Sequence, residues 1–331
     1  MNAPGRRGRG GRPRAPARQA GTLFLRARAP AKVNLVLRVG ARRPDGYHEL
    51  RTLMVPLDLA DSVSLVVHQG RAGGVSCRVP GRPELDGPEN LAARAALAFR
   101  RRFGVRDRLD LSLEKRIPVT AGLGGGSSDA AAVLRMLARA YRVRDRAALA
   151  EIALEVGSDV PFFLGPGPAW VTGRGERLAP VRLGPLHLVL VYPRHPGLAI
   201  RAADAFRWLD QDRPDQGRPI EGSQTISDLA AEARNDLQGP CFRRHPRLRI
   251  LVGRLVGAGA TAAIMSGSGP TVFGISPDRE AAGRTADRMV ELGPDLEVHV
   301  VRTLQRHPGV FRWTSPRSAS SRSVKRSSRP T

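Results

Sequence analysis

A glycine-rich loop directly before a helical stretch is the feature that most constrains this chain. Residues 122–128 are Gly-Leu-Gly-Gly-Gly-Ser-Ser, and apolar residues then recur at helical spacing up to residue 141. Glycines let backbone N–H groups turn toward a ligand, and the start of a helix offers unpaired N–H groups with a partial positive charge. Together they predict an anion site suited to phosphate. The alternative is a flexible turn with a Ser or Asp helix cap.

Two common nucleotide-binding motifs do not fit this loop. No Gly-Lys-Ser/Thr follows it, which excludes a Walker A motif. A serine stands three positions after Gly124 and three positions after Gly125, where G-x-G-x-x-G needs its last glycine. The loop is therefore expected to bind phosphate in another way. Asp129, the first residue of the predicted helix, is expected to cap it and to point away from the phosphates.

The order of the predicted elements favours a mixed α+β protein with two domains, which a length of 331 residues accommodates. Strands and helices do not alternate strictly, so a doubly wound sheet is disfavoured. Gly and Pro clusters in 165–185 suggest a division into 22–182 and 183–304. Strands are predicted at 22–37 with a break near Pro30, and at 50–59, 63–67, 109–113, 186–192 and 298–303, with a strand, loop and strand over 262–275. Helices are predicted at 91–103, 129–141, 147–156, 248–257 and 280–292.

Positive charge gathers at the two ends of the chain. The formal net charge is +24, and residues 1–28 and 302–331 supply sixteen basic residues and no acid. These Arg-, Gly-, Pro- and Ser-rich ends predict disordered basic tails over 1–21 and 305–331. A basic nucleic-acid-binding protein is one alternative that this charge raises. Because the chain between the tails lacks interleaved basic and aromatic residues, we expect no specific nucleic-acid partner.

The spacing of the cysteines and the lack of a long apolar run favour a cytoplasmic protein. Cys77 and Cys241 lie far apart with no C-x-x-C, which argues against a disulfide framework and a zinc cluster and fits a reducing cytoplasm. No apolar run approaches the roughly 20 residues that span a bilayer, so no membrane partner is expected. The N-terminus lacks the apolar segment of a secretory signal, although its Arg-rich, acid-free composition leaves a transit peptide as an alternative.

Lys32 and Asp159 have side chains suited to phosphorylating an alcohol. Only three lysines stand in the chain beside 51 arginines, so a retained lysine suggests a need for a compact ammonium. An acid such as Asp159 can accept the proton of the hydroxyl, and an ammonium can stabilise the transferring group. A solvated strand lysine and a helix-end carboxylate are the alternatives, because the sequence alone does not show that the two side chains meet.

Three stretches resemble the GHMP kinases in family order. Pro118-Val-Thr-Ala-Gly-Leu-Gly-Gly-Gly-Ser-Ser128 resembles their phosphate loop, Ala29-Pro-Ala-Lys-Val-Asn-Leu35 matches near the N-terminus, and Met265-Ser-Gly-Ser-Gly-Pro-Thr-Val-Phe273 matches near the C-terminus. The resemblance implies a two-domain GHMP fold with its active site in the cleft between the domains. It also implies ATP binding by Pro118, Val119, Thr120, Ala121, Gly122, Leu123, Gly124, Gly125, Gly126, Ser127 and Ser128.

A further segment, Arg43-Pro-Asp-Gly-Tyr-His-Glu-Leu50, resembles the diphosphocytidyl-methylerythritol kinases within that family. In that group the Lys of P-A-K-x-N and the Asp of G-[AS]-D-V-P-F are the catalytic pair, which assigns these roles to Lys32 and Asp159. The resemblance implies that Tyr47 stacks on cytosine and that His48 hydrogen-bonds the base. It further implies substrate contacts from Asn34, Phe206, Ser266, Gly267, Ser268 and Gly269; helix core is the alternative for Phe206.

The activity implied is transfer of phosphate from ATP to the 2-hydroxyl of 4-diphosphocytidyl-2-C-methyl-D-erythritol, in non-mevalonate isoprenoid synthesis. Mg²⁺ is expected with ATP, because a hard cation bridges phosphates. Ser128 could help to hold it, and no other metal ligand is assigned. The partners expected are these small molecules, with the chain a monomer or a weak homodimer. Another GHMP kinase with a different alcohol acceptor is the nearest alternative.

Overall fold

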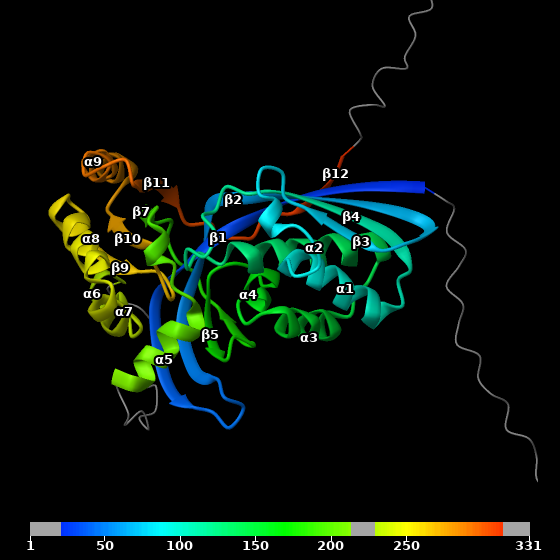
Figure 1. Cartoon of the computed structure of the whole chain (residues 1–331), viewed down its shortest axis with the longest axis horizontal. Coiled ribbons are helices and arrows are strands. Elements are labelled where there is room, and N and C mark those ends of the chain that lie inside the picture. The colour runs from blue at the N-terminus through cyan, green and yellow to red at the C-terminus, as the bar shows by residue number, and fades with distance from the viewer. Residues whose placement is uncertain (1–20, 213–228, 314–331) are drawn as a thin grey trace, which may run out of the picture.

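The computed structural model describes residues 21–212 and 229–313, which form two sheets covered by helices (Figure 1). The larger sheet has the order β12-β1-β2-β4-β3, with β5 and β6 continuing from β2, and β8 beside β1. Its strands are β1 (Gly21–Arg42), β2 (His48–Ala72), β3 (Val75–Arg78), β4 (Asp107–Glu114), β5 (Ala169–Gly173), β6 (Arg177–Pro180), β8 (Arg234–Asn235) and β12 (Val310–Arg312).

A long antiparallel hairpin, β1 with β2, runs through the whole molecule (Figure 1). One end of β1 lies in the core beneath the first helices, and its other end packs into the core of the C-terminal half. The pairing register shifts between Pro30 and Lys32 and again between Asn34 and Val36. Such irregularities bend a strand and re-aim its side chains. They fall at the residues that the sequence marks for catalysis.

Alternation of side chains determines which face of the large sheet is covered. In β2, Val63, Leu65 and Val67 are fully buried, and the residues between them are only partly buried. In β4, Leu109, Leu111 and Leu113 alternate in the same way with polar residues. A period of two places one apolar face against the helices and the other toward solvent.

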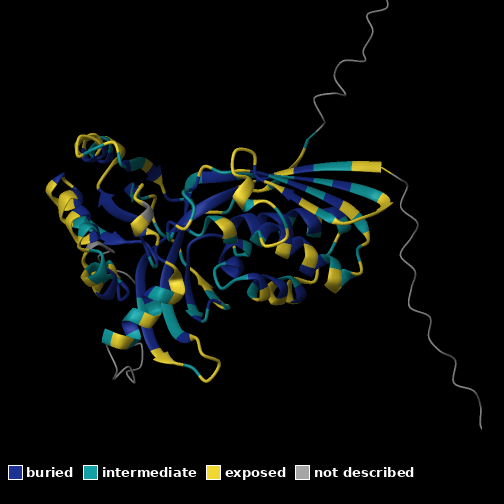
Figure 2. Ribbon diagram, in the orientation of Figure 1, coloured by how far each residue is buried: buried dark blue, intermediate teal, exposed yellow. Residues whose placement is uncertain are grey.

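Helices α1 (Leu91–Phe103) and α2 (Gly125–Tyr141) cover that apolar face, and α3 (Arg146–Val156) and α4 (Val160–Leu164) pack against these helices. Figure 2 shows their inward sides buried and their outward sides exposed. The side chain of Asn90 caps α1 by accepting from Ala92 N at 2.9 Å, and Gly104 ends the helix in the left-handed conformation at φ +64°. This is the end that helices commonly adopt at glycine.

The C-terminal half contains the second sheet, with the order β11-β7-β10-β9. Helices α8 and α9 pack on it, and an apolar cluster around Leu123, Trp170, Leu190 and Phe273 joins the two halves. The elements of this half are β7 (His187–Pro193), η2 (Pro196–Leu198), α5 (Ala202–Asp212), α6 (Leu229–Glu232), α7 (Gln238–Arg244), α8 (Pro246–Gly257), β9 (Ala262–Met265), β10 (Val272–Ser276), α9 (Arg279–Val290) and β11 (Leu296–Arg302); the short η1 (Pro83–Leu85) precedes α1.

The prediction of a mixed α+β protein is confirmed, and four local predictions are wrong. The predicted break near Pro30 is a register shift within one strand, and the strands predicted at 50–59 and 63–67 are one strand. Helix α2 begins at Gly125, so Asp129 lies inside it and its side chain does not cap it. Residues 305–313 belong to the fold and not to a tail, because β12 pairs with Leu25–Ala27 of β1.

The domain division and the disordered tails stay predictions. The division at residue 183 stays a prediction, since apolar clusters include residues from both sides of it. Residues 1–20 and 314–331 of the predicted tails lie outside the described residues. Within 21–212 and 229–313, none of the helices combines the length and apolar character needed to cross a membrane.

Candidate active site

Lys32 and Asp159 lie next to each other. Lys32 Nζ is 3.5 Å from Asp159 Oδ2, with the lysine side chain 5% exposed and the aspartate side chain 39% exposed. The backbone N–H of Lys32 donates to Leu123 O at 2.9 Å, which ties the pair to the glycine loop. A buried ammonium thus faces a carboxylate that a ligand can reach. The two side chains do meet, which the sequence had left open.

The local structure explains how the two side chains are presented. Lys32 lies between the first two of the three register shifts in the β1–β2 pairing, where the strand bends. Asp159 precedes α4, and its side chain makes no capping hydrogen bond, so the carboxylate stays available. Phe162 and Phe163 of α4 are fully buried and anchor this short helix under the site. A rigid support of this kind is what a catalytic group requires.

A chain of hydrogen bonds orients Lys32 and Asn34. Lys32 Nζ donates to Asn34 Oδ1 at 2.7 Å, and Asn34 Nδ2 donates to Thr52 Oγ1 at 2.8 Å. Thr52 in turn donates to Val36 O at 2.7 Å. Lys32, Asn34 and Thr52 are each only 4% exposed. The chain of bonds fixes the amide of Asn34 and holds the ammonium in one position.

The glycine loop is in close contact with a second loop, residues 265–270. Gly122 has φ +75°, and a Cβ there would lie 2.3 Å from Ser266 O. Ser266 Oγ donates to Gly122 O at 3.0 Å. Asn235 holds the second loop by donating to Met265 O at 2.8 Å and Gly267 O at 2.7 Å. Only glycine fits position 122, because a side chain would need both a left-handed backbone and space that Ser266 fills.

Two cavities meet at the glycine loop. The loop cavity, of about 600 Å³, is lined by residues 118–127 together with Asn90 and Lys115. The hairpin cavity, of about 750 Å³, is lined by Lys32, Asn34, Tyr47, His48, Asp159 and Phe206 among others. Both are lined by Gly122, Gly124, Ser127, Ala202 and Ser268. The Lys32–Asp159 pair therefore lies where one ligand in each cavity would come together.

Aromatic and basic side chains form the far part of the hairpin cavity. The rings of His48 and Phe206 are stacked, with centroids 5.3 Å apart and planes inclined by 13°. His48 Nε2 is 2.8 Å from Asp210 Oδ1. Tyr47 is 49% exposed, and the guanidinium of Arg174 lies 5.3 Å from the centre of its ring. This end suits a flat, polar ring system.

Known proteins are similar to this chain in sequence and in fold. Residues 90–167 match the family GHMP kinases N terminal domain, and residues 221–295 match GHMP kinases C terminal. A protein of Anaeromyxobacter sp. (strain K), named 4-diphosphocytidyl-2-C-methyl-D-erythritol kinase, is 65% identical over 92% of this chain and 98% of its own length. A protein of the same name from Symbiobacterium thermophilum is 42% identical over 83% of this chain and 98% of its own length. The chain belongs to the GHMP kinases, in the 4-diphosphocytidyl-2-C-methyl-D-erythritol kinase family.

Solved structures agree with this assignment. A crystal structure of 4-(cytidine 5'-diphospho)-2C-methyl-D-erythritol kinase is 38% identical, with a TM-score of 0.66 over 84% of this kinase and 99% of that chain. The homoserine kinase of Cytophaga hutchinsonii is 19% identical, with a TM-score of 0.60 over 88% of this kinase and 97% of that chain, and shows the fold alone. The two-domain GHMP fold and an ATP-dependent small-molecule kinase are thus confirmed, and a nucleic-acid-binding protein is not supported.

The cavities of the kinase contain most of the predicted site residues. Pro118 to Ser127 line the loop cavity, and Asn34, Tyr47, His48, Phe206, Gly267 and Ser268 line the hairpin cavity. Ser128, Ser266 and Gly269 line neither of them. Ser128 and Ser266 are fully buried, so they lie behind the cavity walls. The predicted contacts of these three residues with a ligand are not supported by their positions.

Sequence reasoning missed the role of Lys115, although it noted how few lysines the chain has. Lys115 lines the loop cavity, contacts Asp61, and donates to Asp129 Oδ2 at 2.6 Å. Asp61 also accepts from Ile117 N at 2.9 Å, which holds the strand that enters the glycine loop. Asp129 thus pairs with a lysine and does not cap α2. The contact of Lys115 with Asp61 joins residues 54 positions apart, which no local motif indicates.

Burial and charge act in opposite directions in this cluster. Burial lowers the pKa of Lys115, but the attraction of Asp129 and Asp61 is larger in sum and leaves that pKa raised. Burial raises the pKa of Asp129, and Lys115 only partly offsets this effect. The ammonium of Lys115 therefore stays charged beside the loop cavity, where it offsets the charge of the buried carboxylates.

Proposed function

We propose that this kinase transfers the γ-phosphoryl group of ATP to the 2-hydroxyl of 4-diphosphocytidyl-2-C-methyl-D-erythritol. The observation that carries the proposal is the Lys32–Asp159 pair, 3.5 Å apart at the junction of two cavities. One cavity has the size and backbone of a nucleotide site, and the other offers aromatic and cationic side chains. The relatives' shared name supports this acceptor.

ATP fits the loop cavity with its phosphates at the glycine loop. Helix α2 begins at Gly125, so its first N–H groups point toward the cavity that residues 118–127 line. Unpaired N–H groups at a helix start attract phosphate oxygens. Lys115 adds a nearby cation. The γ-phosphate would lie toward Gly124 and Ser127, which line both cavities.

The acceptor fits the hairpin cavity with its cytosine at Tyr47 and His48. Stacking on an aromatic ring is a general way to bind a base, and Tyr47 exposes its ring. Because Nε2 of His48 is held by Asp210, the Nδ1 edge is left for the base. Phe206 stacks on His48 and would back the pocket from that side. Arg42, Arg174 and Arg207 also line this cavity and suit a diphosphate.

Asp159 and Lys32 would then carry out the transfer. The 2-hydroxyl oxygen attacks the γ-phosphorus in line, the bond to the β–γ bridging oxygen breaks, and ADP leaves with that electron pair. The carboxylate of Asp159 accepts the hydroxyl proton. The ammonium of Lys32 stabilises the charge on the transferring group. Asn34 holds the ammonium and contacts the methylerythritol part.

Mg²⁺ would come with ATP, but the chain's own residues do not fit a dedicated metal site. In the described part of the chain, no three His, Cys, Asp or Glu side chains gather as a metal site would need. The hydroxyl of Ser128, the ligand considered from the sequence, is buried and lines neither cavity. No step of the proposed reaction is assigned to the ion.

We also place the reaction in the cytoplasm, with a monomer or weak homodimer as the working unit.

An acceptor panel tests the proposal. The purified kinase is incubated with ATP and one alcohol at a time, and ADP release is measured. We expect turnover with 4-diphosphocytidyl-2-C-methyl-D-erythritol and a new phosphomonoester on its 2-hydroxyl by ³¹P NMR. Turnover with homoserine, mevalonate or galactose instead would show a GHMP kinase with a different acceptor. ADP release without added acceptor is the background to subtract.

A further inference from the structure

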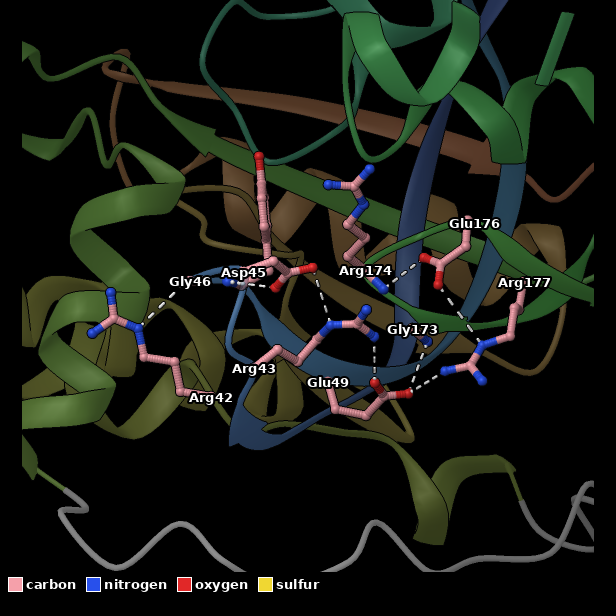
Figure 3. Close-up of polar contacts among 10 residues, drawn as sticks. Arg42, Arg43, Asp45, Gly46, Glu49, Gly173, Arg174, Glu176 and Arg177 are labelled. Atoms are coloured by element: carbon pink, nitrogen blue, oxygen red, sulfur yellow. Dashed lines mark hydrogen bonds and ion pairs between the residues drawn. The ribbon is translucent and has the colours of Figure 1, made fainter. Parts of the chain in front are cut away.

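Glu49 forms hydrogen bonds with residues of two separate turns of the chain (Figure 3). It lies beside the hairpin cavity but does not line it. It follows His48 at the start of β2, and the side chains of His48 and Leu50 line the cavity. Because successive side chains of a strand point to opposite faces, Glu49 faces away from it. Any effect of Glu49 on a ligand must therefore act through other residues.

The carboxylate of Glu49 accepts hydrogen bonds from two segments that are far apart in sequence. Its Oε2 accepts from Arg43 Nη1 at 2.9 Å, in the turn between β1 and β2. Its Oε1 accepts from Gly173 N at 3.1 Å and from Arg177 Nη2 at 2.7 Å, at the two ends of the turn between β5 and β6. Figure 3 shows the carboxylate between these donors. We call these four residues the Glu49 network.

The first of these turns presents Tyr47. Arg43 N donates to Tyr47 O at 2.6 Å, and Arg43 Nε donates to Asp45 Oδ2 at 3.3 Å. Asp45 Oδ1 accepts from Tyr47 N at 3.2 Å. Arg43 therefore joins the backbone of Tyr47 to the carboxylate of Glu49. The position of the Tyr47 ring depends on this turn, because the ring is half exposed and has little packing of its own.

The second turn presents Arg174, whose guanidinium lies over the Tyr47 ring. Gly173 has φ +76°, and a Cβ there would lie 2.2 Å from the carboxylate of Glu176. Glu176 Oε2 accepts from Arg174 N at 2.8 Å and closes this tight turn. Glu49 binds the N–H of Gly173, the residue just before Arg174. The Glu49 network thus sets the distance between the turns that carry Tyr47 and Arg174.

We infer that Glu49 is a positioning residue for acceptor binding, which holds the Tyr47 and Arg174 turns in register around the cytidine end of the hairpin cavity. This inference rests on the proposed function for the identity of the acceptor. Partly exposed ion pairs contribute little to global stability, and the Glu49 side chain is 37% exposed. Its loss should therefore change acceptor binding while the fold persists.

Steady-state kinetics test the inference with three variants. For Glu49→Ala we expect the KM for the diphosphocytidyl acceptor to rise about fivefold, with kcat and the KM for ATP within about twofold of wild type. Glu49→Gln should show a smaller rise, because its amide oxygen can still accept from Gly173 N but lacks the charge that strengthens the arginine bonds. Glu155→Ala, which breaks the exposed pair between Arg101 of α1 and Glu155 of α3 at 2.5 Å, is the matched control and should leave all constants unchanged.

Hydrogen–deuterium exchange gives a second readout that needs no substrate. Peptides covering 43–47 and 173–176 should exchange faster in Glu49→Ala than in wild type and in Glu155→Ala, because both turns lose a bond to the same carboxylate. Unchanged exchange in either turn, an unchanged acceptor KM, or equal changes in kcat and both KM values would each overturn the inference. If wild type fails to phosphorylate the acceptor, the proposed function fails, and the exchange result still decides whether Glu49 holds the turns.

Discussion

The loop cavity and the hairpin cavity share Gly122, Gly124 and Ser127 but are assembled in different ways. Ten consecutive residues, 118–127, form most of one wall of the loop cavity. The hairpin cavity instead collects side chains from β1, β2, the turn before α4, the β5–β6 turn, α5 and the 265–270 loop. The first is built mainly from a continuous backbone, and the second from side chains that are distant in sequence.

This difference separates what the family shares from what one acceptor requires. Backbone N–H groups bind phosphate whatever alcohol is phosphorylated, so the loop cavity can serve every GHMP kinase. Tyr47, His48 and the arginines of the hairpin cavity are suited to one kind of acceptor. Lys32 and Asp159 line the hairpin cavity, and Lys32 lies beside Gly124, which lines both cavities. Substitutions should accordingly fall into three classes: loss of chemistry, loss of the nucleotide, or loss of the acceptor.

The largest effect is expected at the junction. Asp159→Asn should lower kcat by about 10³-fold, because the amide cannot accept the proton of the hydroxyl. Binding of ATP, measured by titration calorimetry, should stay within about twofold of wild type, since Asp159 does not line the loop cavity. Asp287→Asn, on the exposed side of α9, is the control. Full turnover in Asp159→Asn would remove this residue as the base.

A smaller effect is expected at the glycine loop. Gly122→Ala places a methyl group 2.3 Å from Ser266 O at a left-handed backbone position, so the loop must move. A displacement of about 1 Å can cost roughly 100-fold in rate, and we expect a loss of this size in kcat/KM for ATP. Gly283→Ala in α9 has open space around its Cβ and should be neutral or stabilising. Comparable activity of the two variants would contradict the tight contact between the loops.

Removal of the aromatic wall should affect the acceptor alone. Tyr47→Ala is expected to raise the acceptor KM about tenfold, since stacking of one base contributes about 1–3 kcal/mol. The KM for ATP should not change, because Tyr47 does not line the loop cavity. Phe311→Ala is the control, because Phe311 is an exposed aromatic residue of β12. Tyr141 would not serve as a control, because its ring packs on Phe99. Equal rises in both KM values would mean that the two cavities are not independent.

The smallest effect on turnover is expected at His307, which lines neither cavity. Burial, and then the charge of Arg135, lower the pKa of His307 to about 3, and its ring packs on Phe162 and Phe163 of α4. The unfolded chain binds a proton near pH 6.5, and the folded chain does not. Stability is therefore present above pH 6.5 and lost as the pH falls toward 3, by about 3 kcal/mol at pH 4.

His307→Phe should remove this pH dependence and leave both KM values unchanged. Urea unfolding at pH 7 and pH 4 measures the difference, with wild type as the reference. The phenyl ring can keep the packing on α4 without a group that titrates. A wild-type protein equally stable at both pH values would contradict the burial of the neutral imidazole.

The sequence predicted local structure well where the signals were local. Helix α1 was expected at residues 91–103 and is found there, because Asn90 caps it and Gly104 ends it. The glycine loop was found for the same reason, since all its backbone groups are contiguous. The continuous β1–β2 hairpin was missed, because Pro30 normally ends a strand. Here a register shift accommodates it.

Contacts between distant residues account for the rest. The ring pair of His48 and Phe206 and the pairing of Lys115 with Asp129 depend on how the elements pack. The start of α2 was placed four residues late, because glycine disfavours helices. The glycines at positions 124 and 125 leave room for Lys32, Phe163 and Ile117, which a Cβ there would crowd. Family resemblance supplied the pairing of Lys32 with Asp159, which no periodicity could show.

Binding of two ligands to one protein tests the central claim most directly. Titration calorimetry with a non-hydrolysable ATP analogue and with cytidine diphosphate, each added to the free kinase and to the kinase saturated with the other ligand, measures whether the two sites are separate. We expect one molecule of each to bind at the same time, with Tyr47→Ala weakening only cytidine diphosphate. Direct competition, in which saturation with either ligand abolishes binding of the other, would contradict two cavities that meet at Lys32 and Asp159.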